Sequence, residues 1–117
     1  MINGIINVYK ERGFTSFDVV AKLRGILHER KIGHTGTLDP EATGVLPVCI
    51  GNATKVCELL TDKDKVYRTV MHLGITTDTQ DMTGTVKEDR SREAALLKEQ
   101  TVEAAILQFV GDYEQIP

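Results

Sequence analysis

The sequence is poor in cysteine and has no long apolar run, and each absence excludes a class of protein. Its two cysteines, Cys49 and Cys57, have a spacing that fits no zinc site, and both lie among apolar neighbours. We therefore expect buried free thiols in a reducing, cytoplasmic environment. No apolar stretch approaches the roughly 20 residues of a membrane-spanning helix. The first ten residues lack the basic region and cleavage site of a secretory signal.

The sequence also lacks the positive charge that is usual in an RNA-binding domain. Its formal net charge is −3 and its pI is about 5.6. Either basic residues cluster locally in the first third of the chain, or an RNA-binding part lies outside this sequence. The residues available for such a cluster are Lys10, Arg12, Lys22, Arg24, Arg30 and Lys31.

Two phosphate-binding signatures, G-x-x-x-x-G-K-[ST] and G-x-G-x-x-G, are absent from the sequence. Their absence argues against a nucleotide-binding enzyme whose glycine- and threonine-rich loop cradles phosphates, although that alternative stays open. The sequence has no internal repeat and no low-complexity segment. Its 117 residues are enough for one domain at most.

The apolar patterns that are present predict an α+β domain with a mixed, mainly antiparallel sheet and flanking helices. Residues 4–9 form a strand, and a helix capped by Thr15 and Asp18 ends near Arg30. Residues 45–50 form a buried strand, in which Pro47 indicates an edge or a bulge. The other predicted elements are a helix at 54–60, strands at 65–74 and 85–88, a helix at 93–98, and a helix capped by Thr101 with Val102, Ile106, Phe109 and Val110 facing inward.

A loop rich in glycine, proline and threonine precedes the buried strand. Residues 33–47 read GHTGTLDPEATGVLP and show neither a helix nor a strand period. Gly33, Gly36 and Gly44 permit positive φ, and Pro40 biases Asp39 away from the helical region. We expect Asp39 on an ordered turn with its carboxylate held out from the backbone, in the kind of loop that often carries function.

This loop also carries a family resemblance. The run HTGTLDP at residues 34–40, followed by ATGVLP at 42–47, resembles the catalytic-aspartate motif of the TruB family of tRNA pseudouridine synthases. A looser similarity extends from Asn3 to Pro117. The resemblance implies a partial pseudouridine synthase fold. It also implies an enzyme that isomerises a uridine in the tRNA T-loop without a metal or redox cofactor. A base inside a folded RNA loop must be flipped out before it can react.

Asp39 has two interpretations. An aspartate before a proline in a turn is commonly structural, because its side chain hydrogen-bonds to nearby backbone. The resemblance implies instead that Asp39 is the catalytic nucleophile. It would attack the uridine at the base or the ribose, while the base is detached, turned and rejoined through carbon in place of nitrogen.

His34, Thr37 and Tyr67 are further candidates. From the sequence pattern alone, His34 is interpreted as a loop histidine that hydrogen-bonds to the backbone, and Tyr67 as an aromatic residue packed in the core. The resemblance implies that His34 enters the T-loop and fills the space left by flipped bases, and that Thr37 contacts the substrate. It also implies that Tyr67 stacks on the uracil and that its hydroxyl takes the proton lost from the base.

Two other stretches share the resemblance. Residues 10–16, KERGFTS, resemble the family's first motif, K-P-x-G-x-T-S, with Glu11 where proline is usual. The resemblance implies that Lys10 binds substrate, and the alternative is a solvated lysine at a strand end. Residues 77–84, TDTQDMTG, resemble a family stretch in which Asp78 would shape the substrate cleft, and the alternative is a plain polar loop.

TruB-like proteins are longer than this sequence. We therefore expect residues 1–117 to be the N-terminal part of a catalytic domain, without its remaining strands, its active-site arginine and the RNA-binding PUA domain. Open strand edges would then make the chain prone to self-association. A non-catalytic RNA-binding module on the same scaffold is the main rival function, although the presence of Asp39, His34 and Tyr67 argues against it.

Overall fold

The structure is a computed structural model that describes residues 2–117. The chain divides into two compact units, Met1–Val66 and Tyr67–Pro117, and each is described by itself. Within the described residues, none of the helices has both the length and the apolar character needed to cross a membrane. The predicted α+β class is confirmed, and every strand pair among residues 2–117 is antiparallel.

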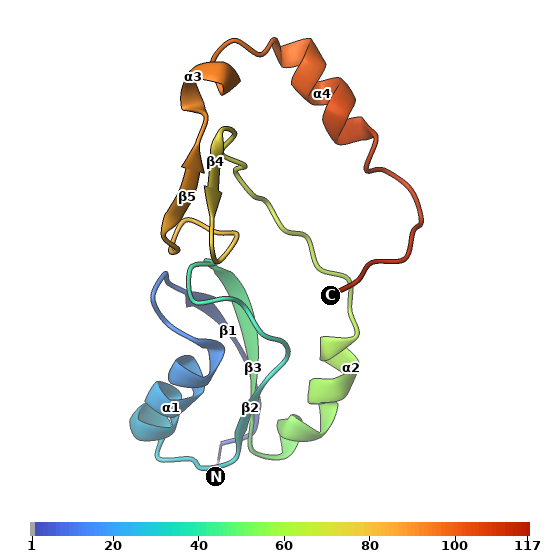
Figure 1. Ribbon diagram of the computed structural model, residues 1–117. Helices are drawn as coiled ribbons and strands as arrows, with labels where there is room; N and C mark the ends of the chain where they lie inside the picture. The colour runs from blue at the N-terminus through green and yellow to red at the C-terminus, as the bar shows by residue number, and fades with distance from the viewer. Residues whose placement is uncertain (1) are drawn as a thin grey trace. The chain divides into compact units, whose positions relative to one another are not determined.

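The first unit is built on a three-stranded sheet (Figure 1). Strand β3 (Gly44–Ile50) lies in the centre, between β1 (Gly4–Lys10) and β2 (Ile32–His34). The pairing of β1 with β3 runs without interruption from Gly4 opposite Ile50 to Lys10 opposite Gly44. The short strand β2 was missed in the sequence because its three residues merge into the glycine-rich loop that follows.

The prediction that Pro47 marks an edge or a bulge is wrong, because β3 is the central strand and its register is regular. In an antiparallel strand, the N–H and C=O groups of one residue point toward the same neighbouring strand. The Pro47 carbonyl accepts hydrogen bonds from the Thr35 amide at 3.2 Å and the Thr35 hydroxyl at 3.0 Å, so the proline nitrogen also faces away from β1. The β1 ladder therefore loses no bond to this proline.

Helix α1 (Ser16–Leu27) covers one face of this sheet, and its start was predicted correctly. Thr15 and Asp18 form the capping box: each side chain accepts a hydrogen bond from the backbone of the other. The helix ends three residues before the predicted Arg30, since His28 adopts a left-handed conformation with φ of 52°. The core between helix and sheet consists of Val19, Val20, Ile32, Leu46, Val48 and Ile50.

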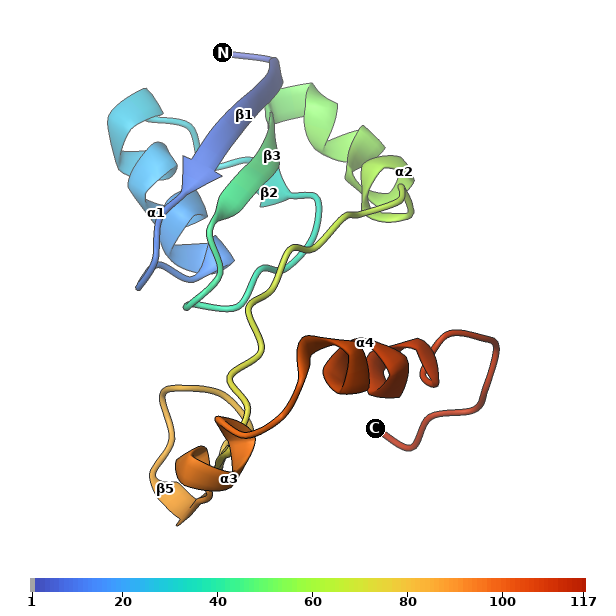
Figure 2. The ribbon, with the colours of Figure 1, turned by 90° about the horizontal axis from the view of Figure 1, so that it is seen from above.

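A 3-10 helix, η1 (Gly51–Val56), and α2 (Cys57–Thr61) follow β3, where the sequence predicted one helix at 54–60. They lie over the end of the opposite face at Gly33 and Cys49, whereas Ile5, Tyr9 and Val45 on that face are exposed. Figures 1 and 2 show α1 and α2 on opposite sides of the three strands. Gly51 begins this segment with φ of 62°, and a side chain there would collide with Asn3 and with the Ile2 carbonyl. A glycine is therefore required where the chain leaves β3.

The second unit contains a two-stranded hairpin and two short helices. Strand β4 (Ile75–Thr77) pairs with β5 (Val86–Asp89), with an irregular register between Thr76 and Thr77. Helices α3 (Ser91–Ala94) and α4 (Glu99–Leu107) follow. The acidic excess of the protein lies in this unit, which has five Lys and Arg against nine Asp and Glu, whereas the first unit has nine against eight.

Four sequence predictions fail around this second unit. The strand predicted at residues 65–74 is absent: residues 64–72 have no regular structure, and Val66 and Val70 are 98% and 97% exposed. An extended segment is stable as a strand only when another strand pairs with it, and none of the described residues does so. Helix α4 begins at Glu99 after Lys98, so Thr101 is not its cap, and α3 is shorter than predicted. Of the residues expected to face inward from α4, Ile106, Phe109 and Val110 are exposed.

Candidate active site

Asp39 lies on a β-turn in the loop between β2 and β3. The Ala42 amide donates to the Asp39 carbonyl at 2.9 Å, which closes a turn with Pro40 at its second position, where the fixed φ of proline is favoured. The Asp39 side chain is exposed and accepts none of the hydrogen bonds formed among the described residues. Its backbone therefore holds the turn and leaves the carboxylate free, which is the arrangement that a nucleophile needs.

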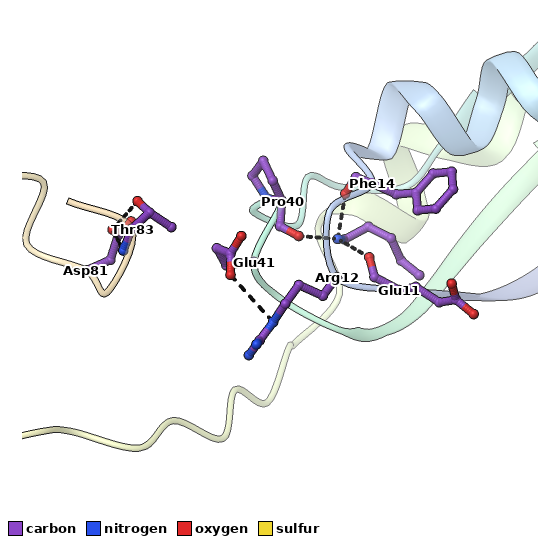
Figure 3. A network of polar contacts seen from close by, with 8 residues as sticks. Glu11, Arg12, Phe14, Pro40, Glu41, Asp81 and Thr83 are labelled. Carbon is purple, nitrogen blue, oxygen red and sulfur yellow. Dashed lines mark hydrogen bonds and ion pairs between the residues drawn. The ribbon is translucent and has the colours of Figure 1, made fainter.

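A buried lysine fixes the position of this turn. The side chain of Lys10 is fully buried, and its ammonium donates to three backbone carbonyls: Phe14 at 2.7 Å, Glu11 at 3.0 Å and Pro40 at 3.2 Å. Figure 3 shows these three carbonyls converging on one nitrogen. The Pro40 carbonyl also accepts from the Gly13 amide at 2.8 Å. The Asp39–Pro40 turn is thus tied directly to the loop after β1.

This geometry corrects one interpretation of Lys10 and changes the other. Lys10 is not a solvated lysine at a strand end, because none of its side chain is exposed. An ammonium has three donors, and all three are used on backbone carbonyls. The predicted substrate contact stays a prediction, but the contacts support a positioning role for Lys10, acting through Pro40 on Asp39.

Replacing Lys10 by Met, which has similar length but no donor, is expected to lower the free energy of unfolding by about 1–3 kcal/mol. The Glu11 and Phe14 carbonyls would lose their charged donor, and amide exchange in residues 36–44 should accelerate. Urea unfolding and hydrogen exchange measure the two effects. Lys55→Met, at an exposed lysine, is the matched control. Equal stabilities of the two variants would contradict the positioning role.

Two further contacts hold the loop on its other side. Ser16, at the start of α1, is buried, and its hydroxyl accepts a hydrogen bond from the Leu38 amide at 3.1 Å. Thr35 is buried and bonded twice to the Pro47 carbonyl. An exposed ion pair between Arg12 and Glu41, at 3.5 Å, adds little, since exposed pairs are worth at most about 1 kcal/mol. Ser16 and Thr35 lie within the motifs of the sequence, but nothing in those motifs indicates that they support Asp39, because their partners are distant in the chain.

His34 and Thr37 flank this supported loop. His34 is the last residue of β2, opposite Val48, so it is not a loop histidine. Its ring is half-buried, and its Nδ1 atom is buried with no hydrogen-bond partner among the described residues, so this nitrogen does not bond to backbone. Thr37 is exposed and lies two residues before Asp39. Of the three glycines that permit positive φ, Gly36 and Gly44 use it, with φ of 157° and 153°, whereas Gly33 is regular strand.

Tyr67 and Asp78 belong to the second unit. Tyr67 is 61% exposed and in no strand, so the interpretation as a packed core aromatic is wrong. The Asp78 carboxylate accepts the Thr85 amide at 2.8 Å and so helps to close the hairpin. Nearby, hydrogen bonds from Thr83 and then Thr79 hold the pKa of Asp81 below its usual value. Thr77 bonds to the Asp81 carbonyl at 2.6 Å, which makes this loop a self-supporting structure, unlike a plain polar loop.

The first unit also has a surface groove, but this groove does not bring the predicted site residues together. A groove of about 270 Å³ lies between β1 and α1 and is lined by Val8, Tyr9, Glu11, Phe14, Val19, Lys22, Leu23 and Ile26. None of the predicted site residues lines it. Among residues 2–117, no group of three or more His, Cys, Asp and Glu side chains is arranged to hold a metal ion.

Comparison with protein families places this loop in a known context. Residues 24–117, which include the whole Asp39 turn, match the model described as TruB family pseudouridylate synthase (N terminal domain). The chain belongs to the TruB family. The match begins inside α1, so Lys10 lies outside the matched range. The loop that Lys10 holds through Pro40 lies within that range.

Individual TruB relatives extend the similarity to the whole chain. The chain is 52% identical over 117 residues to tRNA pseudouridine synthase B of Bacillus pumilus and 50% identical to that of Staphylococcus epidermidis, covering all of this chain and 38% of each relative. It is 80% identical over 74 residues to the protein of the same name from Lachnoclostridium phytofermentans, covering 63% of this chain and 24% of that protein. The chain therefore spans less than two fifths of the length of these relatives.

Proposed function

We propose that this chain is part of a tRNA pseudouridine synthase, and that it carries the nucleophile of the reaction. The observation that supports this most directly is the Asp39 turn: an exposed, unbonded carboxylate on a backbone fixed by Lys10, Gly13 and Ser16. A structural aspartate in such a turn would use its side chain to hold the turn. Here the backbone and a buried lysine hold the turn, and the carboxylate is available for covalent catalysis.

The proposed reaction isomerises a uridine in the tRNA T-loop. Asp39 attacks the flipped nucleotide at the base or the ribose, and the bond from ribose to base nitrogen breaks. The base then rejoins the ribose through carbon, and the bond to Asp39 breaks, which frees the carboxylate. His34 occupies the space that the flipped bases leave, and Thr37 lies beside Asp39 to contact the substrate. Tyr67 stacks on the uracil and takes the proton released from its carbon. The names of the relatives, together with the family match, support tRNA as the substrate.

The proposed domain organisation follows from the relatives' length. We infer that residues 1–117 correspond to the N-terminal part of a catalytic domain, and that activity requires the part of the relatives that this chain does not cover. Activity is therefore tested in a chimera, in which these 117 residues replace the matched region of the Bacillus pumilus protein. The chimera is incubated with tRNA transcript, which is then digested to nucleosides. Pseudouridine in the digest supports the proposal, whereas tRNA binding without product favours a non-catalytic RNA-binding module.

Tyr67→Phe in the chimera separates two roles of Tyr67. Phenylalanine keeps the stacking face and removes the hydroxyl, so turnover should fall by about a hundredfold or more while tRNA affinity changes little. Tyr67→Leu removes both and should weaken binding as well. Single-turnover kinetics and filter binding measure the two quantities. Wild-type turnover in Tyr67→Phe would restrict Tyr67 to stacking. Tyr113→Phe, at another exposed tyrosine of the second unit, is the control.

A further inference from the structure

The two cysteines of the chain meet on the face of the sheet that is turned away from α1. Cys49 lies in β3 between Val48 and Ile50, which belong to the core under α1, so its side chain points to the opposite face. It is fully buried there, beneath the segment that forms η1 and α2. Cys57 begins α2 and is half-buried, and both thiols are free.

A glycine creates the space in which the two sulfur atoms approach each other. Gly33 of β2 is the cross-strand partner of Cys49. The Cys57 sulfur lies only 3.2 Å from the position that a Cβ atom on Gly33 would take. Directly opposed Cβ positions in a sheet are about 4.5–5.5 Å apart. The Cys57 sulfur therefore lies beside the Cys49 side chain on this face of the sheet.

The environments of the two thiols give them different reactivity. Burial, and secondly the contact with Cys57, raises the pKa of Cys49 to about 11, so this thiol is protonated at neutral pH and shielded from solvent. Cys57 is half-buried and is therefore the more accessible of the two thiols. A more accessible thiol beside a buried one is the arrangement in which oxidation of the first is resolved by the second.

We propose that Cys49 and Cys57 are a modification site, at which a hydroperoxide converts the two thiols into an intramolecular disulfide. Cys57 attacks the peroxide, so that its thiol becomes a sulfenic acid and one water molecule or alcohol leaves. The Cys49 sulfur then attacks the Cys57 sulfur, the S–O bond breaks, and a second molecule of water carries away the Cys49 proton. Two thiols are oxidised by two electrons and one peroxide is reduced. A thiol reductant reverses the step.

The disulfide bond would change the packing on β2, the strand that leads into the proposed active site. It joins the first residue of α2 to the central strand and closes a short loop through η1. The Cys57 sulfur leaves its place above Gly33, which directly precedes His34 in β2. Oxidation is therefore expected to change amide exchange at residues 32–34 and 57–61, and to leave the α1 core unchanged.

The test treats the reduced chain with one equivalent of hydrogen peroxide, followed by peptide mapping without reduction. The expected product is monomeric, lacks both free thiols, has lost the mass of two hydrogen atoms, and shows a cross-link between the Cys49 and Cys57 peptides. Dithiothreitol should restore both thiols. A disulfide-linked dimer, a Cys57 sulfinic acid with Cys49 unchanged, or full recovery of two free thiols would each overturn the proposal.

Three variants test the order of the steps. Cys49→Ser should leave Cys57 as a sulfenic acid that dimedone traps, whereas Cys57→Ser should leave Cys49 unmodified at the same peroxide dose. Gly33→Ala should slow disulfide formation several-fold, because the added methyl group displaces the Cys57 sulfur. Gly25→Ala, where a side chain meets open space, is its control. Rapid oxidation of Cys49 in Cys57→Ser would overturn the assigned order even if either serine variant is less stable.

Discussion

Asp39→Asn in the chimera should reduce pseudouridine formation by at least about a thousandfold and leave tRNA affinity within about threefold. Asparagine keeps the size of the side chain, and the turn is held by the Asp39 carbonyl and by contacts to Pro40, which the substitution does not touch. An amide is a poor nucleophile, so the chemical step is lost while the loop keeps its position. Single-turnover product formation and filter binding measure the two quantities.

The matched control is Glu41→Gln, which removes a negative charge from the same turn. It breaks only the exposed pair with Arg12, so activity should remain within about twofold. If Asp39→Asn retained substantial product, Asp39 would not be the nucleophile. If both variants lost activity and tRNA binding together, the effect would lie in the charge or the fold of the loop, and the assignment would again fail.

Residues 1–117 alone are expected to be inactive, marginally stable and prone to self-association, and to gain stability when the remainder of a relative is supplied. The extended segment at 64–72 has unpaired backbone groups and exposed apolar side chains, among them Val66, Val70 and Met71. Strand β1 is an edge strand whose Ile5, Ile6 and Tyr9 are exposed. Open edges of this kind pair with another chain.

Sedimentation and thermal melts test this expectation, with the chain alone and with the unmatched region of the Bacillus pumilus protein added as a separate polypeptide. The mixture should melt several degrees higher than the chain, sediment as one complex and form pseudouridine. Val70→Lys, which places a charge in the extended segment, should weaken the association, and Leu107→Lys, at an exposed position on α4, is a control. A monomeric chain with a sharp cooperative melt and normal turnover would contradict the expectation.

The sequence determined those parts of the protein whose causes are local. The Thr15–Asp18 capping box fixes the start of α1, and the apolar pattern of residues 45–50 predicts the buried strand β3. The Asp-Pro dipeptide predicts the Asp39 turn, because proline restricts both its own φ and the preceding residue. The family resemblance through HTGTLDP was likewise a property of residues adjacent in the chain, and the family match confirms it.

Tertiary structure decided the features that depend on residues far apart in the sequence. From the sequence, Lys10 is indistinguishable from a surface lysine. It is buried because the carbonyl of Pro40, thirty positions later, accepts a hydrogen bond from its ammonium. Pro47 is tolerated in the central strand because Thr35 bonds to its carbonyl on the side away from β1. Residues 65–74 have the composition of a strand, but residues 64–72 form no regular structure, since a strand is stabilised by its neighbour and not by its own propensity. Local sequence thus predicted where Asp39 turns, and long-range contacts decided what holds that turn in place.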